Sequence, residues 1–299
     1  MGGYAIIEAP SVLGLFPGGV ERLPAALLEA GLADALGARR AAVVIPPPYD
    51  PRRDTTTGLR NPTGLRDYAH QLADATGEVL DSGEVPVVLG GDCSILLGNL
   101  LALRRRGRHG LLFLDGHADF YQPEAEPNGE AASMDLALAT GRGPRVVAEL
   151  DGQGPLVRDE DVVVVGRRDA EEAERAGSQR IEDTAVAVLD LATVRERGAD
   201  AAAHEALERL RRPELAGFWI HLDCDVLDDA VMPAVDYRLP GGLSWNELET
   251  VIRVAVESGE AVGLEVTIFN PSLDPAGAIA RALVARLVSA LDDRHLRPG

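Results

Sequence analysis

Short apolar segments alternate with longer amphipathic segments along most of the chain. The apolar segments have the length of strands and are rich in Val, Ile and Leu without strict alternation, which is typical of strands covered on both faces. They are Tyr4–Glu8, Ala41–Ile45, Val85–Leu89, Leu111–Leu114, Val162–Val165, Ala185–Leu189, Phe218–Leu222 and Ala261–Val266. Helical spacing of apolar residues is found over Glu21–Leu36, Asp67–Leu80, Ile95–Arg105, Ala201–Arg211, Trp245–Ser258 and Ala276–Leu291.

This alternation predicts an α/β fold with a single doubly wound parallel sheet of about eight strands, right-handed crossovers and helices on both faces. No repeat or linker divides the chain, so residues 1–299 are predicted to form one domain. One long loop, Pro46–Gly64, is rich in proline and polar residues. Because it follows a strand, we expect it at the carboxyl edge of the sheet, where α/β proteins bind ligands.

Polar motifs directly follow two of the predicted strands. Gly90–Ser94 (Gly-Gly-Asp-Cys-Ser) comes after Val85–Leu89 and predicts a tight turn from a strand into a helix. Asp115, His117 and Asp119 come after another strand at positions i, i+2 and i+4, and therefore project to one side of an extended chain. Two carboxylates and an imidazole at a strand end are a candidate half-site for a divalent metal.

The same spacing recurs at His221, Asp223 and Asp225, after another apolar run. Carboxylates this close together repel each other unless a cation or a proton holds them. An Asx-type turn with a structural histidine explains any single one of these residues. Two such clusters at strand ends of one parallel sheet instead predict a shared site with room for two metal ions.

The order of the motifs along the chain resembles the ureohydrolases, the family of arginase, agmatinase and formimidoylglutamase. Binuclear phosphoesterases use similar motifs in the reverse order. The resemblance covers nearly the whole chain, and the motifs that carry it are Gly18–Glu21, Gly90–Ser94, Asp115–Phe120, Arg168–Asp169, Asp223–Asp228, Gly241–Leu243 and Asn270–Pro271.

The resemblance implies a centre of two divalent metal ions, usually manganese. Asp115 and Asp223 would bridge the two ions. The other ligands would divide between them, Cys93 and Asp119 with one ion, His117 and Asp225 with the other. A mostly carboxylate set suits Mn²⁺ or a similar hard ion. The paired ions would lower the pKa of a water between them, which would then attack a trigonal guanidinium or amidine carbon at neutral pH.

Three positions depart from the family pattern. Cys93 stands where arginases and agmatinases have histidine, and a softer thiolate ligand favours Zn, Fe or Ni relative to manganese. An inert, buried cysteine is the alternative interpretation. The histidine that shuttles protons in the family falls at Ala132, and the glutamate that pairs with the guanidinium falls at Ile268. Glu265 lies three residues earlier, on the opposite face of a strand, and is not expected to replace that glutamate.

The segment after the second motif also changes. The family positions that contact a substrate carboxylate are here Tyr121, Glu126, Asn128 and Glu130. Acidic residues would repel a carboxylate, so they either attract a second positive charge or lie solvated at the rim. Glu171 matches an acidic family position that meets the substrate amine.

His221 is a further catalytic candidate, as a base or as a residue that orients Asp223. Its alternative is a histidine hydrogen-bonded at the sheet edge. The hydroxyarginine amidinohydrolase branch resembles this chain at Cys93 and over His221–Leu227, but it keeps a glutamate at Ile268, so its substrate is not carried over. Cys224 alternates away from Asp223 and is predicted to be a buried free thiol.

Composition narrows the choice of chemistry and partners. The chain has 29 basic and 48 acidic residues, a net charge of −19, and contains no lysine. Without lysine, catalysis through a Schiff base and phosphate binding by a P-loop are excluded. The negative charge makes neither a nucleic acid nor a membrane an expected partner. No segment has the apolar length of a membrane span, and no secretory signal is visible. Two cysteines cannot form a disulfide scaffold, which favours a cytoplasmic location.

These observations lead to one main hypothesis and one alternative. The main hypothesis is a metal-dependent amidinohydrolase that acts on a small cationic guanidino or amidino compound other than plain arginine, with Asp119, His221 and Glu171 as catalytic candidates. The alternative is an impaired homologue that retains metal as a binding or regulatory protein. The resemblance also implies a homo-oligomer, a trimer or a hexamer.

Overall fold

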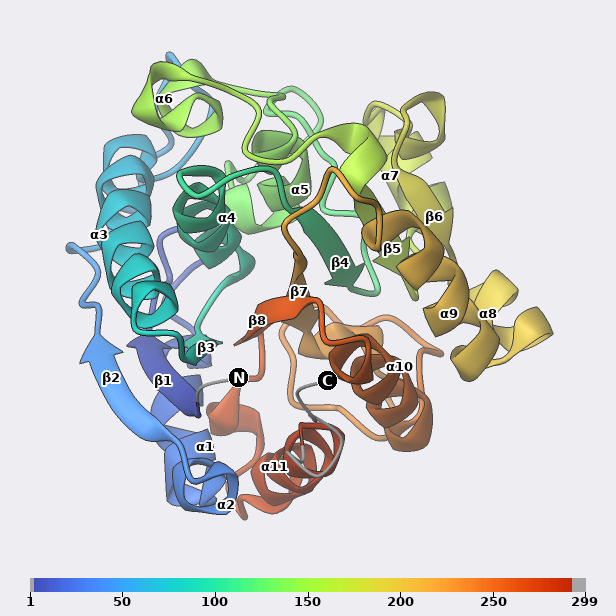
Figure 1. The fold of residues 1–299 in the computed structure, drawn as a ribbon. Helices are drawn as coiled ribbons and strands as arrows, with labels where there is room; N and C mark the ends of the chain where they lie inside the picture. The colour runs from blue at the N-terminus through green and yellow to red at the C-terminus, as the bar shows by residue number, and fades with distance from the viewer. Residues whose placement is uncertain (1–2, 292–299) are drawn as a thin grey trace.

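The protein is described here by a computed structural model covering residues 3–291, so the outermost ends of the predicted domain lie outside the described residues (Figure 1). The described strands form one 8-stranded parallel sheet in the order β2-β1-β3-β8-β7-β4-β5-β6, which confirms the predicted fold class. The strands are β1 (Tyr4–Ala9), β2 (Arg39–Val43), β3 (Val85–Gly90), β4 (Gly110–Leu114), β5 (Val162–Val165), β6 (Ala187–Leu189), β7 (Phe218–Asp223) and β8 (Ala261–Thr267).

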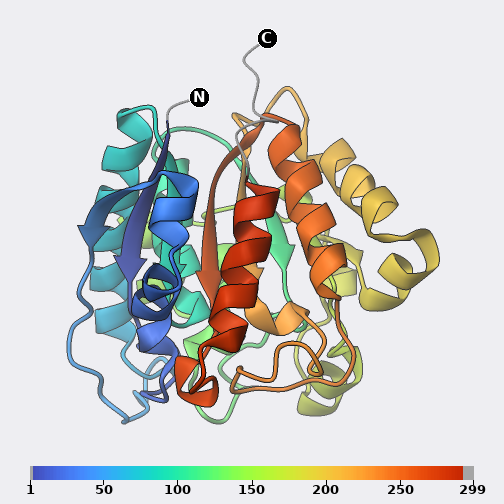
Figure 2. The same cartoon turned by 90° about the horizontal axis from the view of Figure 1, so that it is seen from below.

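Helices cover both faces of the sheet (Figures 1 and 2). On one face lie α3 (Pro62–Asp81), α4 (Leu96–Arg104), α5 (Asp135–Ala139) and α6 (Arg145–Ala148). On the other lie α1 (Leu23–Glu29), α2 (Leu32–Leu36), α9 (Ala199–Leu210), α10 (Trp245–Glu257) and α11 (Ala278–Ala290), while α7 (Ala170–Ala176) and α8 (Leu191–Arg197) follow β5 and β6. The helix predicted over Glu21–Leu36 is divided at Gly31, whose φ of 93° no helix allows.

The two-sided cover explains why the strands are apolar without alternation. In β1, Ile6 belongs to the core beneath α1, α10 and α11, whereas its neighbour Ile7 belongs to the core beneath α3 and α4. Both side chains are 0% exposed. Successive strand residues point to opposite faces, so a sheet buried on both sides requires apolar residues at every position.

The strand order places the predicted motifs together. β3, β8, β7 and β4 are consecutive neighbours at the centre of the sheet. Because all strands are parallel, their carboxyl ends meet at one edge, and Leu114 of β4 pairs with Leu222 of β7 just before their motifs begin. Motifs more than 100 residues apart in the sequence therefore meet in one place.

The loop predicted over Pro46–Gly64 ends earlier than expected, because α3 already begins at Pro62. The loop contacts the segment that follows β4. Arg60 forms an ion pair with Glu130, and Arg53 donates to the carbonyl oxygen of Pro123 at 2.6 Å. Within residues 3–291, no helix combines the length and the apolar character needed to cross a membrane.

Candidate metal centre

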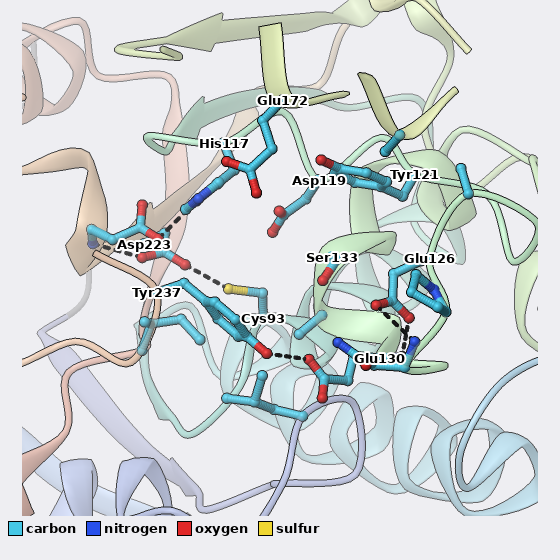
Figure 3. A pocket seen from close by; sticks show the side chains of 18 residues that line it. Cys93, His117, Asp119, Tyr121, Glu126, Glu130, Ser133, Glu172, Asp223 and Tyr237 are labelled. Atoms are coloured by element: carbon cyan, nitrogen blue, oxygen red, sulfur yellow. Dashed lines mark hydrogen bonds and ion pairs between the residues drawn. The ribbon is translucent and has the colours of Figure 1, made fainter. Parts of the chain in front are cut away.

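The six side chains predicted as metal ligands converge at the carboxyl ends of the central strands, and Figure 3 shows Cys93, His117, Asp119 and Asp223 among them. Together with His221 the six form three groups in which the candidate ligand atoms all lie within 4.8 Å of one another. The groups are Asp115, His117 and Asp225; Asp115, Asp119 and Asp223; and Cys93, His221 and Asp223. Asp115 and Asp223 each belong to two groups, which is the arrangement that bridging carboxylates require.

The two shared carboxylates each divide their oxygens between a turn and the site. Oδ1 of Asp115 accepts a hydrogen bond from the backbone N–H of His117 at 2.6 Å, and Oδ1 of Asp223 accepts from that of Asp225 at 2.7 Å. Oδ2 of Asp115 is buried without a hydrogen-bond partner among the described residues, and Oδ2 of Asp223 accepts from the Cys93 thiol at 2.8 Å. The Asx-turn and metal-ligand interpretations are therefore compatible, because one carboxylate serves both.

His117 and Asp225 form the opposite side of the centre. Nδ1 of His117 lies 2.9 Å from Oδ2 of Asp225. Although burial opposes it, the charges of Asp225 and Asp115 raise the pKa of His117 well above its usual range. Burial likewise opposes ionisation of Asp225, but His117 holds the pKa of that carboxyl below its ordinary value. Arg168 donates to the carbonyl oxygen of Asp225 at 2.7 Å and so fixes the end of β7.

The centre buries more acidic side chains than it has positively charged partners for among the described residues. Asp115, Asp119 and Asp223 have pKa values raised well above normal, first by burial and then by neighbouring carboxylates. Asp135, at the start of α5, is also fully buried, and its pKa is raised by burial and by Asp115. No motif in the sequence marks Asp135, because only the tertiary structure brings it near Asp115. A bound cation relieves such repulsion, so the donor set fits divalent metal ions.

A rigid turn holds Cys93 in the centre. A side chain at Gly91 would place its Cβ only 1.9 Å from the carbonyl oxygen of Ser11, so only glycine fits there. Asp92 accepts hydrogen bonds from the backbone N–H of Ser94 at 2.9 Å and from the Ser11 hydroxyl at 3.0 Å. Burial, followed by the charge of Asp223, raises the pKa of the Cys93 thiol well above normal. The thiol therefore stays protonated unless a metal ion replaces its proton.

The centre opens into a pocket of about 260 Å³. Tyr121, Glu126, Asn128 and Glu130, the four residues at altered substrate-contact positions, all line it. Glu126 and Glu130 are only 6% and 4% exposed, so they are built into the wall and are not a solvated rim.

Tyr237, which the sequence analysis did not single out, also lines the pocket and donates its hydroxyl to Glu130 at 2.7 Å (Figure 3). It comes from the loop after β7, and no motif marks it. The contact joins two walls of the pocket that are more than 100 residues apart in the sequence.

Ala132 and Ile268 line the pocket at the positions predicted to depart from the family. Ile268 has φ of 68°, a backbone conformation that a β-branched residue rarely adopts. Its N–H donates to the carbonyl oxygen of Gly91 at 2.8 Å, which ties it to the turn before Cys93. Glu265 does not line the pocket and is 0% exposed beneath it.

Two catalytic candidates lie outside the pocket lining. Glu171 and Glu172 are both exposed on α7, but only Glu172 lines the pocket, where it points toward His117 and Asp119 (Figure 3). One residue along a helix turns the side chain by about 100°, so the start of α7 decides which glutamate faces inward. His221 is fully buried beneath the centre and does not reach the pocket.

The buried acids predict a pH-dependent stability for the metal-free protein. A carboxyl whose pKa is higher in the folded than in the unfolded state stabilises the fold below the unfolded pKa and loses that contribution as the pH rises through the folded pKa. Asp115, Asp119 and Asp223 are such groups. Because the pKa of His117 is also raised, its contribution has the same sign.

We therefore expect the metal-free protein to unfold at a lower temperature at about pH 8 than at about pH 5. Added Mn²⁺ or Zn²⁺ should restore stability at the higher pH, because the ions bind the folded state. Thermal unfolding with and without a chelator across this range measures the effect. An unfolding temperature of the metal-free protein that rises from about pH 5 to about pH 8 would contradict it.

Comparison with known proteins agrees with this fold and identifies the family. The model of the Arginase family matches residues 8–291. Arginase of Staphylococcus aureus (strain MRSA252) is 28% identical over 283 residues, which span 91% of each chain. The structure of arginase from Bacillus caldovelox superimposes with a TM-score of 0.89 at 27% identity, covering 98% of this chain and 99% of that one. Formimidoylglutamase from Bacillus subtilis shares the fold, with a TM-score of 0.76 at 19% identity. This chain belongs to the arginase family.

Proposed function

We propose that this protein hydrolyses a C–N bond of a small guanidino or amidino compound other than plain arginine, using two divalent metal ions. The observation that carries the proposal is the set of three overlapping ligand groups, in which Asp115 and Asp223 each belong to two groups, beside an acidic pocket. Members of the arginase family are hydrolases with a binuclear metal centre. Manganese is the first candidate metal, and Zn, Fe or Ni become candidates because of Cys93.

The charge of the pocket supports a cationic substrate. Glu126, Glu130 and Glu172 line its wall in addition to the metal-ligand carboxylates, and no arginine of residues 3–291 lines it. Arg60 forms an ion pair with Glu130, but the wall as a whole is acidic, so a substrate carboxylate would be repelled whereas a guanidinium or an ammonium group would be attracted. This asymmetry favours guanidino compounds without a free carboxylate over arginine.

Different residues of the chain would bind the metal ions and transfer the proton in the proposed reaction. The carboxylates of Asp115, Asp119, Asp223 and Asp225, with His117, would hold the ions, which when bound would activate water and polarise the carbon under attack. We propose Glu130, which lines the pocket, for proton transfer in place of the family histidine at Ala132. Burial raises the pKa of Glu130, while the hydrogen bond from Tyr237 opposes the rise.

The remaining catalytic candidates take supporting places in this proposal. Glu172, and not the exposed Glu171, is placed to meet the far end of the substrate. His221 does not line the pocket, so we do not propose it as a group that contacts the substrate.

The proposal is tested by turnover on a defined panel. Purified protein is loaded separately with Mn²⁺, Zn²⁺, Fe²⁺ and Ni²⁺ and assayed for urea or ammonia release from arginine, guanidinoalkylamines, guanidino acids and N-hydroxyguanidines. We expect turnover of a guanidino compound that lacks a free carboxylate, and much weaker turnover of arginine. Metal-loaded protein that turns over no member of the panel would overturn the catalytic proposal.

A binding or regulatory role is the second candidate function. It is favoured by one observation, that Ala132 and Ile268 remove two family side chains from the pocket while the metal-ligand groups remain. In either case we propose a cytoplasmic homo-oligomer, a trimer or a hexamer, whose size light scattering would measure.

A further inference from the structure

We propose that His221 is a direct metal ligand, and that Cys93, His221 and Asp223 together hold the ion on the cysteine side of the centre. This inference rests on the proposed metal centre and names a ligand set within it. The set contains one sulfur, one nitrogen and one oxygen donor, so it favours Zn²⁺ over Mn²⁺.

The first observation is geometric. A ring nitrogen of His221, Sγ of Cys93 and a carboxylate oxygen of Asp223 lie within 4.8 Å of one another, and all three residues are buried. Ligand atoms around one zinc ion lie roughly 3.3–3.8 Å apart, because zinc–ligand distances are about 2.0–2.3 Å. Small side-chain movements therefore suffice to close the group on an ion. Three protein ligands with a fourth position open is the usual arrangement of a catalytic zinc site.

The second observation is an unpartnered nitrogen. Nδ1 of His221 lies 2.6 Å from Oε1 of Glu265. Because an ionised carboxylate only accepts hydrogen bonds, this contact favours the tautomer with its hydrogen at Nδ1, in which Nε2 carries a free lone pair. Nε2 is buried and has no hydrogen-bond partner among residues 3–291. Leaving such an acceptor buried and unpaired costs about 1–3 kcal/mol, and a metal ion beside Cys93 would satisfy it.

The third observation is that the ring is held as metal-binding histidines are held. Such histidines donate their other N–H to a carboxylate or a carbonyl, which fixes both the tautomer and the orientation of the ring. Here Glu265 receives that hydrogen bond and is itself held by Asn99, which in turn accepts from the Thr76 hydroxyl at 2.8 Å. Phe113 stacks on the ring, with centroids 4.4 Å apart and planes inclined by 10°.

The same contacts explain why Glu265 is buried. It faces the same side of the sheet as His221, with which it is paired in register between β7 and β8. Burying a carboxylate costs its hydration energy, and a hydrogen bond from a neutral histidine compensates only part of that cost. A carboxylate that accepts a hydrogen bond from a metal-bound histidine is better compensated, because it also interacts with the charge of the ion.

X-ray absorption at the zinc edge tests the inference on the unaltered protein. Metal-free protein receives a single equivalent of Zn²⁺, which should enter the site with the softest ligands first. We expect one sulfur and one imidazole in the ligand shell. A shell with sulfur and no imidazole would show that Cys93 binds without His221, and a shell without sulfur would place the ion elsewhere. Either result overturns the inference.

Cobalt titration of variants gives a second, independent readout. The thiolate-to-cobalt charge-transfer band reports only an ion bound to a cysteine. In His221→Asn the cobalt affinity measured from this band should fall by more than the roughly 10–100-fold that loss of an outer hydrogen-bond partner causes. Glu265→Gln changes only that outer partner, so its loss of cobalt affinity should stay within the roughly 10–100-fold range. His204→Asn, on the exposed face of α9, should leave the affinity unchanged.

The variants also separate this inference from the proposed function. Equal cobalt affinity in His221→Asn and in the unaltered protein would overturn the role of His221 even if turnover is found. Conversely, absence of turnover on the whole guanidino panel would overturn the proposed reaction and leave a sulfur-and-imidazole shell intact.

Discussion

Replacing Asp119 by asparagine should lower turnover by on the order of 100-fold or more, because the change removes one buried charge that the catalytic centre needs. Asp119 is 7% exposed, lines the pocket and shares a metal-ligand group with Asp115 and Asp223. Asparagine keeps the shape of the side chain but loses the negative charge, so the affinity for the divalent ions should fall together with activity.

The metal-free protein should respond in the opposite direction. Burial and the charge of Asp135 both raise the pKa of Asp119, so its ionised form is unfavourable in the metal-free fold. Asparagine removes this repulsion at neutral pH. The unfolding temperature of the metal-free variant should therefore increase, by roughly 2–4 °C for each kcal/mol of repulsion removed. Metal analysis, turnover and thermal unfolding measured on the same preparation distinguish an altered centre from a misfolded protein.

Asp151→Asn is the matched control for this experiment. Asp151 also has a left-handed backbone, with φ of 56° against 43° at Asp119, but it is exposed on the surface. The control should keep its metal and its turnover. The same comparison separates the two candidate functions, because a binding protein would lose metal or ligand affinity in Asp119→Asn without having turnover to lose. Full metal content and full activity in Asp119→Asn would contradict a ligand role for Asp119.

Replacing Cys93 by histidine should shift the metal preference from zinc toward manganese by at least about tenfold, which corresponds to roughly 1.4 kcal/mol of binding free energy. The reason is that the change exchanges a soft thiolate for a harder nitrogen ligand. Cys93 lies in the group with Asp223 and is held there by the rigid Gly91–Asp92 turn, so the new ring would face the same ion.

Competition between equal concentrations of Mn²⁺ and Zn²⁺, followed by elemental analysis, measures this shift. Cys224→Ala is the matched control, because Cys224 is a buried free thiol that belongs to the core beneath α10 and α11 and to no metal-ligand group. It removes one thiol without touching the centre and should leave the preference unchanged. An unchanged preference in Cys93→His would show that Cys93 is not a ligand.

The fold follows closely from the pattern of apolar residues. Each strand predicted from that pattern overlaps a strand of the structure, because both sheet faces are buried and each strand is therefore a continuous apolar segment. The helix predicted over Glu21–Leu36 was too long, since the apolar spacing continues through Gly31 while the backbone does not. The break at Gly31 depends on a positive φ, which a hydrophobic pattern does not report.

The sequence predicts the candidate site less completely than it predicts the fold. Spacing after strands, which is local information, indicated Asp115, His117, Asp119, Asp223 and Asp225, and the resemblance to the ureohydrolases added Cys93. The structure brings all six together. Glu172, Asp135 and Tyr237 carry no such spacing and were missed. Strand alternation correctly kept Glu265 out of the pocket but could not indicate its partner, because the pairing of β7 with β8 joins residues 44 positions apart.

Local patterns in the sequence thus identified the strands, the α/β class, the acidic metal-binding chemistry and the unusual cysteine. These properties depend on residues within a few positions of one another, where backbone geometry alone decides which side chains share a face. The tertiary structure decided which oxygen of each shared carboxylate faces the site, which glutamate of α7 lines the pocket and what lies beside His221. Those outcomes depend on strand order and packing between distant segments. The −19 charge of the chain is spread along the sequence, and only the fold concentrates part of it on one buried centre.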